Sequence, residues 1–178
     1  IVDPATRHSP AEFYIDLFRL TGLSYHEITH CFCTHHHETH WMGFDYFPNA
    51  KWMTGVGNKE LIIETARKVR VRAYRNASIY STALDTSRIM EVTGEFLPGI
   101  YALPLPGHTP CLYGIAFADG DKRIVHASDA VVTRRHFEDR VTENQNDREW
   151  ARVAAKTISD IAESFDIVIP GHDNIIVI

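Results

Sequence analysis

The stretch Thr34-His35-His36-His37-Glu38-Thr39-His40 places four histidines within six residues of a chain that has eleven in all. Histidines concentrated in this way mark either a purification tag or a metal site, and a tag would be terminal rather than internal. Imidazole nitrogen is a preferred zinc ligand. The spacing of His35 and His37 lets two rings converge from one extended turn, and His40 follows three residues later. The stretch therefore predicts a metal site.

Further candidate ligands also follow predicted strands. Residues 27–33 have the pattern of a short buried strand, so the histidine stretch lies in the loop after it, where functional residues usually sit. Three more residues come directly after predicted strands: His108 in Pro-Gly-His-Thr, Asp129 in His-Ala-Ser-Asp and His172 in Pro-Gly-His. Residues at strand ends can meet along one rim of a sheet, so these three join the predicted site.

The hydrophobic periodicity predicts one mixed α/β domain over residues 1–178. Helices are expected over 9–22, with Ser9 as a possible cap, and over 147–164, with Asn146 as the cap. Residues 59–70 fit either a helix or a strand. Asp119-Gly120-Asp121 is a hairpin signal. The apolar start at Ile1-Val2 also suggests a strand, and further strands are expected near 51–54, 88–93, 99–105, 111–118, 123–127 and 166–169.

Composition narrows the class of partners. The net charge of -5 and the pI of about 6.1 are unlike the basic surface that non-specific nucleic-acid binding requires. No apolar run approaches the roughly 20 residues that span a bilayer. The three cysteines are an odd, low number that suits a reducing compartment rather than a disulfide framework. We therefore expect a cytoplasmic protein that acts on a small molecule, without nucleic-acid or membrane partners.

The four motifs in this order resemble those of the metallo-β-lactamase superfamily. The family's T-H-x-H-x-D-H corresponds to residues 34–40, its P-G-H-T to residues 106–109, its bridging aspartate to Asp129 and its last P-G-H to residues 170–172. Residues 47–51 are also similar to the family. The resemblance implies a four-layer αββα sandwich with the metal site on one edge. Family members have strands before the segment that matches Ile1–Pro4, and these N-terminal strands are expected to be abbreviated or missing here. Either the chain is truncated at this point or that half of the sandwich is abbreviated. The absence of these strands would leave apolar surface for a second subunit, so a homo-oligomer is possible.

The resemblance also implies the ligand set and the chemistry. His35, His37 and His108 would hold a first metal, His40 and His172 would belong to a second, and Asp129 would bridge both. Zinc is expected as one or two ions, with iron or manganese as alternatives. Metal-bound hydroxide would hydrolyse a small ester, lactone, thioester or similar substrate. Asp129 would orient the hydroxide, and His172 would contact the substrate or transfer protons if the second metal is absent.

One departure from the family pattern leaves alternatives open. Thr39 stands where the motif has an aspartate, and a neutral hydroxyl is a poor metal ligand. The second metal site could be weak or empty, Glu38 or Asp45 could replace the aspartate, or catalysis could be lost while metal binding persists. A different register, His36-x-Glu38-x-His40, resembles diiron redox flavoproteins but departs from their motif at two positions. Cys31 and Cys33 are predicted to be small buried residues, and the aromatic residues after the histidines fit either a pocket wall or the core.

Overall fold

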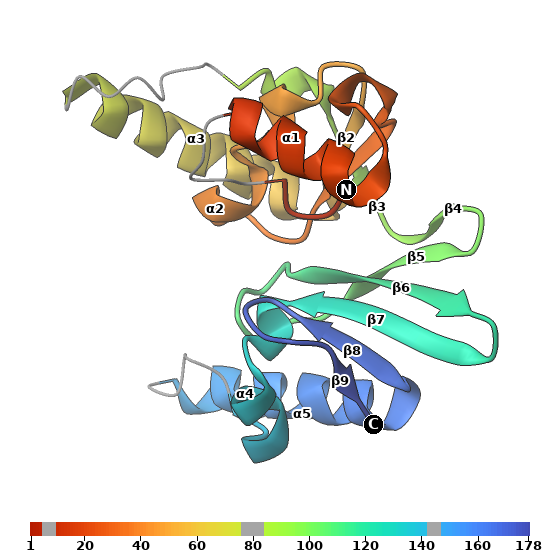
Figure 1. The fold of residues 1–178 in the computed structure, drawn as a ribbon. Coiled ribbons are helices and arrows are strands. Elements are labelled where there is room, and N and C mark those ends of the chain that lie inside the picture. Colours follow the sequence, from red (N-terminus) through yellow and green to blue (C-terminus); the bar gives the residue numbers. More distant parts are fainter. Residues whose placement is uncertain (5–9, 76–83, 142–146) are drawn as a thin grey trace. The chain divides into compact units, whose positions relative to one another are not determined.

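The computed structural model describes residues 1–4, 10–75, 84–141 and 147–178. Its contacts divide the chain into two compact units, the N-terminal unit, Ile1–Glu91, and the C-terminal unit, Val92–Ile178. Each unit contains a sheet and helices (Figure 1), so the prediction of a mixed α/β fold is confirmed. A single domain over residues 1–178 stays a prediction.

The N-terminal unit has a three-stranded sheet in the order β1 (His30–Cys33), β2 (Lys51–Gly55), β3 (Ile89–Val92). β1 and β2 are parallel, with Cys31 opposite Trp52. The start of the chain runs parallel to β1, because Val2 bridges to Phe32 and the Asp3 amide donates to the Phe32 carbonyl at 2.8 Å. The apolar first residues therefore behave like a strand and bring Asp3 to the end of β1.

Helices and 3₁₀ turns complete this unit: α1 (Pro10–Thr21), α2 (Glu38–Trp41), α3 (Asn58–Arg75), η1 (Tyr25–Glu27), η2 (Phe44–Tyr46) and η3 (Thr86–Arg88). The segment 59–70 is helical, so its strand alternative is wrong. α3 begins where the Glu91 carboxylate accepts the amides of Gly57 and Lys59 at 2.7 and 3.2 Å, which satisfies donors that a helix start leaves open. The expected cap Ser9 lies outside the described residues.

The core of the N-terminal unit lies between this sheet and its helices. Cys31, Cys33 and Trp52 pack with residues of α1 and α3, and all three are at most 1% exposed. The prediction that both cysteines are small buried residues is therefore confirmed. The aromatic residues after the histidines belong to this core as well: Trp41, Phe44 and Phe47 are buried in it, and Tyr46 packs against it. The core interpretation of these aromatics is the one that the structure supports.

The C-terminal unit has a six-stranded sheet in sequence order: β4 (Gly94–Leu97), β5 (Ile100–Pro104), β6 (Tyr113–Asp119), β7 (Lys122–Ser128), β8 (Ile167–Pro170) and β9 (Ile176–Val177). β4 and β9 were not predicted. The predicted hairpin is confirmed, because β6 and β7 are antiparallel, Asp119 faces Lys122 and Gly120 has a φ of 59°. β7 and β8 are parallel, so their carboxyl ends lie at the same edge of the sheet.

Helix α5 (Arg148–Ser164) covers one face of this sheet (Figure 1). Its Ile158 and Ile161 pack in one cluster with Val125 and Val168 of the two parallel strands. The helix is capped by Asp147, whose carboxylate accepts two amides of the first turn, and the predicted cap Asn146 lies outside the described residues. The turn η4 (Asp129–Val131) and the short helix α4 (Arg134–Asp139) follow β7.

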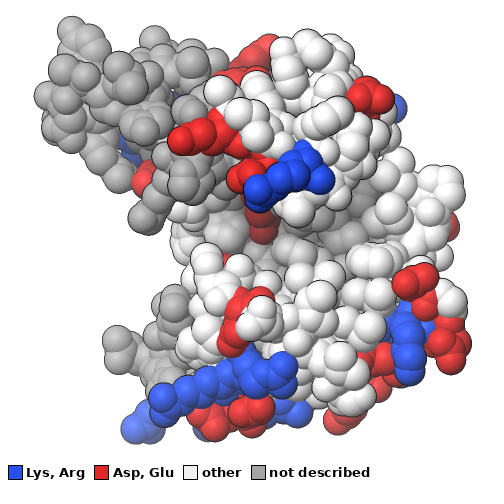
Figure 2. Space-filling model, viewed as in Figure 1, with Lys and Arg blue, Asp and Glu red and all other residues white. Residues whose placement is uncertain are grey.

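The distribution of charged side chains on the surface agrees with the mixture of acidic and basic residues in the sequence. On the face shown in Figure 2, acidic and basic side chains both occur among uncharged ones. Among the described residues, no helix is both long enough and apolar enough to cross a bilayer.

Candidate metal centre

In the N-terminal unit the predicted ligands lie in the loop that follows β1 and in the short helix α2 after it. His35 is fully buried, His40 is 7% exposed in α2, and the side chain of His37 is exposed. The Nε2 atom of His35 lies 3.0 Å from the Nδ1 atom of His37. The ring of His40 lies beside that of His35, with 4.0 Å between the ring centroids and an interplanar angle of 48°. The structure thus brings together the three histidines that the sequence predicted in this part of the site.

Two of these ring nitrogens have the geometry of metal ligands. The Thr34 hydroxyl donates to Asp3 Oδ2 at 2.9 Å, so it acts as the acceptor for His35 Nδ1 at 3.1 Å. That bond places the His35 proton on Nδ1 and leaves the Nε2 lone pair toward His37. Two nitrogen ligands of one tetrahedral zinc ion stand about 3.3 Å apart, given bonds of about 2.0–2.1 Å. The observed separation of 3.0 Å lies within about 0.3 Å of that distance.

Asp3 fixes the orientation of the third histidine. One carboxylate oxygen accepts the Thr34 amide at 2.8 Å, and the other lies 2.9 Å from His40 Nδ1. A carboxylate that holds one ring nitrogen of a histidine selects the tautomer whose other nitrogen can bind metal. Sequence reasoning missed Asp3. Its only signal was the apolar Ile1-Val2 run, whose alignment beside β1 could have placed the next residue near the histidine stretch.

Cys33 has a structural role beside the histidines. Its thiol donates to the His35 carbonyl at 2.8 Å. Complete burial, with a further effect from the Asp3 charge, raises the pKa of this thiol well above its usual value. Because this thiol is already engaged by a backbone carbonyl, we leave Cys33 out of the candidate ligand set. Thr39 is exposed in α2, and replacement of the motif aspartate by Glu38 or Asp45 stays a prediction.

In the C-terminal unit the three remaining predicted ligands come together around one carboxylate. Asp129 Oδ2 lies 3.5 Å from His108 Nε2, and Asp129 Oδ1 lies 3.3 Å from His172 Nε2. The side chains of His108 and Asp129 are each 9% exposed, whereas that of His172 is 61% exposed. A largely buried carboxylate between two imidazole rings is a donor set that suits a divalent transition metal.

The backbone around Asp129 explains how the carboxylate reaches this position. Ser128 has a φ of 49°, a left-handed conformation that is costly for serine and turns the chain sharply after β7. The Gly171 and His172 amides donate to the carbonyls of Val131 and Val132 at 3.0 and 2.9 Å. A Cβ at Gly171 would lie only 2.3 Å from Asp129 Oδ1. The glycine of Pro-Gly-His is therefore required because the carboxylate passes directly over it.

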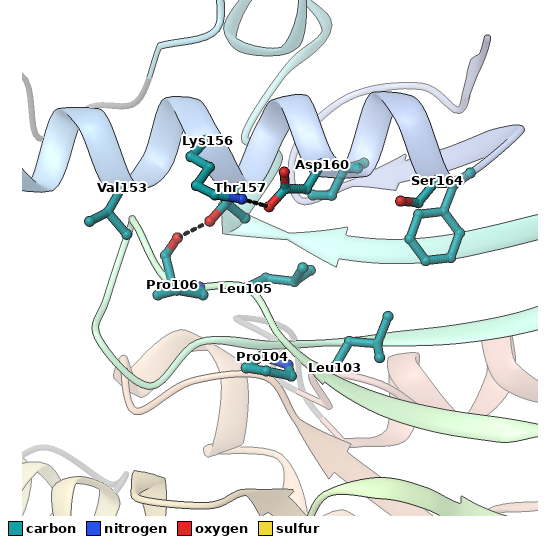
Figure 3. Close-up of a pocket in the computed structure, with 11 residues that line it drawn as sticks. Leu103, Pro104, Leu105, Pro106, Val153, Lys156, Thr157, Asp160 and Ser164 are labelled. Atoms are coloured by element: carbon teal, nitrogen blue, oxygen red, sulfur yellow. Dashed lines mark hydrogen bonds and ion pairs between the residues drawn. The ribbon is translucent and has the colours of Figure 1, made fainter.

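The glycine of Pro-Gly-His-Thr serves a similar purpose beside α5. Gly107 has a φ of 149°, and a Cβ there would lie 2.7 Å from the Ala154 backbone. The Thr157 hydroxyl donates to the Pro106 carbonyl at 2.6 Å, as Figure 3 shows. The loop that carries His108 therefore packs directly against α5 and is hydrogen-bonded to it.

A pocket of about 420 Å³ lies between α5 and residues 103–106 (Figure 3). It is lined mainly by apolar side chains of both segments, and a Lys156–Asp160 ion pair of 2.6 Å lies at its edge. His108, Asp129 and His172 are not among its lining residues. This pocket is therefore distinct from the candidate ligand set.

Comparison with known proteins agrees with the geometry. The profile of the metallo-beta-lactamase superfamily matches residues 1–172. The chain belongs to this superfamily. No curated protein matches the chain.

Solved structures of this superfamily share the fold. A putative metallo-beta-lactamase from Thermotoga maritima has 20% sequence identity and a TM-score of 0.71, over 99% of this chain and 81% of the other. An N-acyl homoserine lactone hydrolase with its product at the catalytic metal centre has 22% identity and a TM-score of 0.63, over 89% of this chain and 61% of its own. A dizinc quorum-quenching lactonase has 16% identity and a TM-score of 0.62, over 95% and 65%.

These comparisons confirm the predicted family and its fold. At such identities the likeness to the lactonases concerns the fold alone, and the chain spans less than two thirds of their length. The roles of the individual site residues stay predictions.

Proposed function

We propose that the chain is a metal-dependent hydrolase whose metal centre is completed by two sets of side chains. The N-terminal set consists of His35, His37 and His40, and the C-terminal set of His108, Asp129 and His172. The observation that carries the proposal is that, within each unit, the predicted ligand atoms converge, at 3.0 Å for the His35–His37 pair and at 3.5 and 3.3 Å around Asp129. Membership in the metallo-beta-lactamase superfamily supports the joining of the two sets.

The donor set favours zinc, because five imidazoles and one carboxylate match its preferred ligands, and iron or manganese would bind similar groups less selectively. A bound zinc ion lowers the pKa of a coordinated water to about 7 and so supplies a nucleophile at neutral pH. The protein's own residues hold this arrangement in place. Thr34 and Asp3 fix the rings of His35 and His40, and Asp129 is fixed by the close approach of Gly171.

The substrate that we propose is a small molecule with a hydrolysable ester, lactone or thioester bond. The similar structures include lactone hydrolases that act on N-acyl homoserine lactones. His172, with a side chain that is 61% exposed, is a candidate ligand accessible to a substrate and to proton exchange with solvent. A lactone is therefore the first substrate class to test.

Metal content and hydrolysis should be measured on the same preparation. Protein loaded with zinc and then dialysed should retain at least one ion per chain and cleave a short-chain lactone, and His35→Asn and Asp129→Asn should each reduce both. His136→Asn is a matched control, because His136 bonds to Thr133 rather than to either set. Wild-type protein that retains no zinc, or an unchanged metal content in both ligand variants, would contradict the proposal.

A second candidate function is metal binding without hydrolysis. The observation that favours it is Thr39, a neutral, exposed side chain at the position of the motif aspartate. If the chain is a degenerate enzyme, the wild type should bind metal yet leave esters, lactones and thioesters intact, and Thr39→Asp should gain a second ion and activity. Unchanged stoichiometry in Thr39→Asp would count against this idea. A colourless zinc protein would exclude the diiron alternative, which requires visible iron absorption.

A further inference from the structure

The histidine loop has an uncommon pattern of backbone hydrogen bonds. Four successive carbonyls, from the last residue of β1 into the loop, each accept a bond from a side chain: Cys33 from Thr54 Oγ1 at 2.9 Å, Thr34 from Asn58 Nδ2 at 3.4 Å, His35 from Cys33 Sγ at 2.8 Å and His36 from Trp41 Nε1 at 2.8 Å. The donors come from β2, the start of α3, β1 and α2. Elements that surround the loop therefore hold its backbone from several directions.

These bonds act on the part of the chain that must be rigid if the two rings are to meet. Loop carbonyls normally face water, and a buried one has to find a partner within the protein. The Cys33 carbonyl and its donor Thr54 are fully buried, and the Asn58 side chain is buried as well. None of the four donors belongs to the candidate ligand set. Their common effect is to fix the peptide units between which His35 and His37 project.

Trp41 closes this arrangement. Its indole is 3% exposed and reaches back from α2 to the His36 carbonyl. His37 and His40 lie between the two ends of this bond in the sequence, so it restrains the segment that carries both rings. Loss of the indole N–H would leave the His36 carbonyl without this donor while the aromatic packing in the core largely remains.

We propose that Cys33, Trp41, Thr54 and Asn58 are positioning residues that shape the histidine loop before a metal arrives. Preorganisation of this kind raises metal affinity because the ligands lose less freedom on binding. The inference rests on the proposed function, since it takes the histidines to be metal ligands. It adds that the loop keeps its ligand geometry in the metal-free protein.

Trp52 offers a closely matched control for Trp41. Both indoles belong to the same core, both are at most 3% exposed, and each donates to a carbonyl five residues earlier, His36 for Trp41 and Phe47 for Trp52. Trp41→Phe and Trp52→Phe therefore remove the same kind of bond from the same core. Only Trp41→Phe removes it from the histidine loop.

The experiment titrates metal-free protein with Co²⁺ and follows visible absorption, because cobalt occupies sites of the zinc type and reports its ligand geometry. Trp41→Phe should weaken Co²⁺ binding by about tenfold, the lower end of the effect of removing supporting contacts around a metal site. Trp52→Phe should stay within about twofold of the wild type. In metal-free protein, amide hydrogen exchange over residues 34–40 should become faster in Trp41→Phe alone.

A second pair of variants tests the hydroxyl donor at the other end of the loop. Thr54→Val removes the bond to the Cys33 carbonyl at nearly constant volume and should therefore weaken Co²⁺ binding. Thr54→Ser keeps the hydroxyl donor and should bind Co²⁺ as the wild type does. Equal loss of affinity in both tryptophan variants, or no loss in Trp41→Phe, would overturn the positioning role alone. Wild-type protein that binds no Co²⁺ would overturn the metal site and this inference with it.

Discussion

The two units present their candidate ligands by different means. In the N-terminal unit three histidines come from one short stretch, and side-chain donors and the Asp3 carboxylate hold the stretch in place. In the C-terminal unit His108, Asp129 and His172 come from three separate loops at strand ends. There the positions depend on backbone features, namely the left-handed Ser128 and the closely packed Gly107 and Gly171.

The difference follows from what each backbone can do by itself. Loop peptides that have no strand beside them need side chains as hydrogen-bond partners. Residues at the ends of the paired strands β7 and β8 are positioned by the register of the sheet. The only further requirement is that the loops after these strands have small residues where they pack closely. Metal binding by the N-terminal set should therefore decrease when a hydrogen-bonding side chain around the loop is lost. Metal binding by the C-terminal set should decrease when side-chain volume is added at the closely packed glycines.

The largest effect is expected from added volume at Gly171. In Gly171→Ala the new methyl group would lie 2.3 Å from Asp129 Oδ1 and 3.0 Å from the Ser128 backbone, so the carboxylate must move. We expect loss of the metal bound through Asp129 and a decrease of about 1–3 kcal/mol in the free energy of unfolding. Zinc stoichiometry and urea unfolding measure the two effects.

Gly99→Ala is the control for this prediction. Gly99 has a φ of 73°, but a Cβ added there would have no heavy atom within 4 Å, so the change costs only backbone strain of about 1 kcal/mol. Its metal content should equal that of the wild type. If Gly171→Ala retained full metal content, the steric account of the C-terminal set would be wrong.

An intermediate effect is expected from Asp3→Asn in the N-terminal set. The asparagine can still accept one bond from Thr34, but its amide group presents a donor where the carboxylate accepted. His40 Nδ1 would then have to accept, which moves the ring proton to the nitrogen that the metal needs. Zinc affinity should fall about 10–100-fold, as measured by competition with a chelator.

Asp16→Asn serves as the comparison for Asp3→Asn. Asp16 pairs with Arg19 on the surface of α1, with a side chain that is 60% exposed, so its replacement should leave zinc affinity unchanged. Equal affinities in Asp3→Asn and wild-type protein would show that the carboxylate does not select the histidine tautomer.

The sequence predicted the features that depend on local pattern. α5 has a long apolar stripe that includes Ile158 and Ile161, and the turn at Gly120 has a residue that tolerates its positive φ, so both were found. The candidate ligands were predicted because their motifs are local and the order of these motifs resembles that of a known family. Periodicity over many residues and short chemical motifs are therefore the parts of this fold that sequence reasoning recovers.

The features that were missed depend on contacts between distant segments. β4 and β9 are only four and two residues long, and each exists because a neighbouring strand pairs with it. Asp3 acquires its role only when the first residues align beside β1, and the donors Thr54 and Asn58 lie far along the chain from the carbonyls that they hold. No local pattern of hydrophobicity reports such pairings.

The smallest effect is expected from Asp166→Asn, which weakens the C-terminal unit without touching its candidate ligands. The Asp166 carboxylate accepts the amide and side-chain donors of Arg123, tying the start of β7 to the residue before β8. The Arg123 side chain and amide lower the pKa of Asp166 from 3.8 to about 2. Because the folded-state pKa is lowered, this stabilisation is present above the ordinary pKa and is lost as the pH falls through about 2.

Unfolding measured across this pH range checks the prediction. The stability difference between wild-type protein and Asp166→Asn should be small and constant at neutral pH and should disappear as the wild-type carboxylate becomes protonated. It should also shrink in high salt, because the Arg123 side chain is 59% exposed and the pair is screened by ions. Zinc content should stay at the wild-type value. A loss of metal in Asp166→Asn would mean that the C-terminal set depends on the anchoring of β8 as well as on the close packing at Gly171.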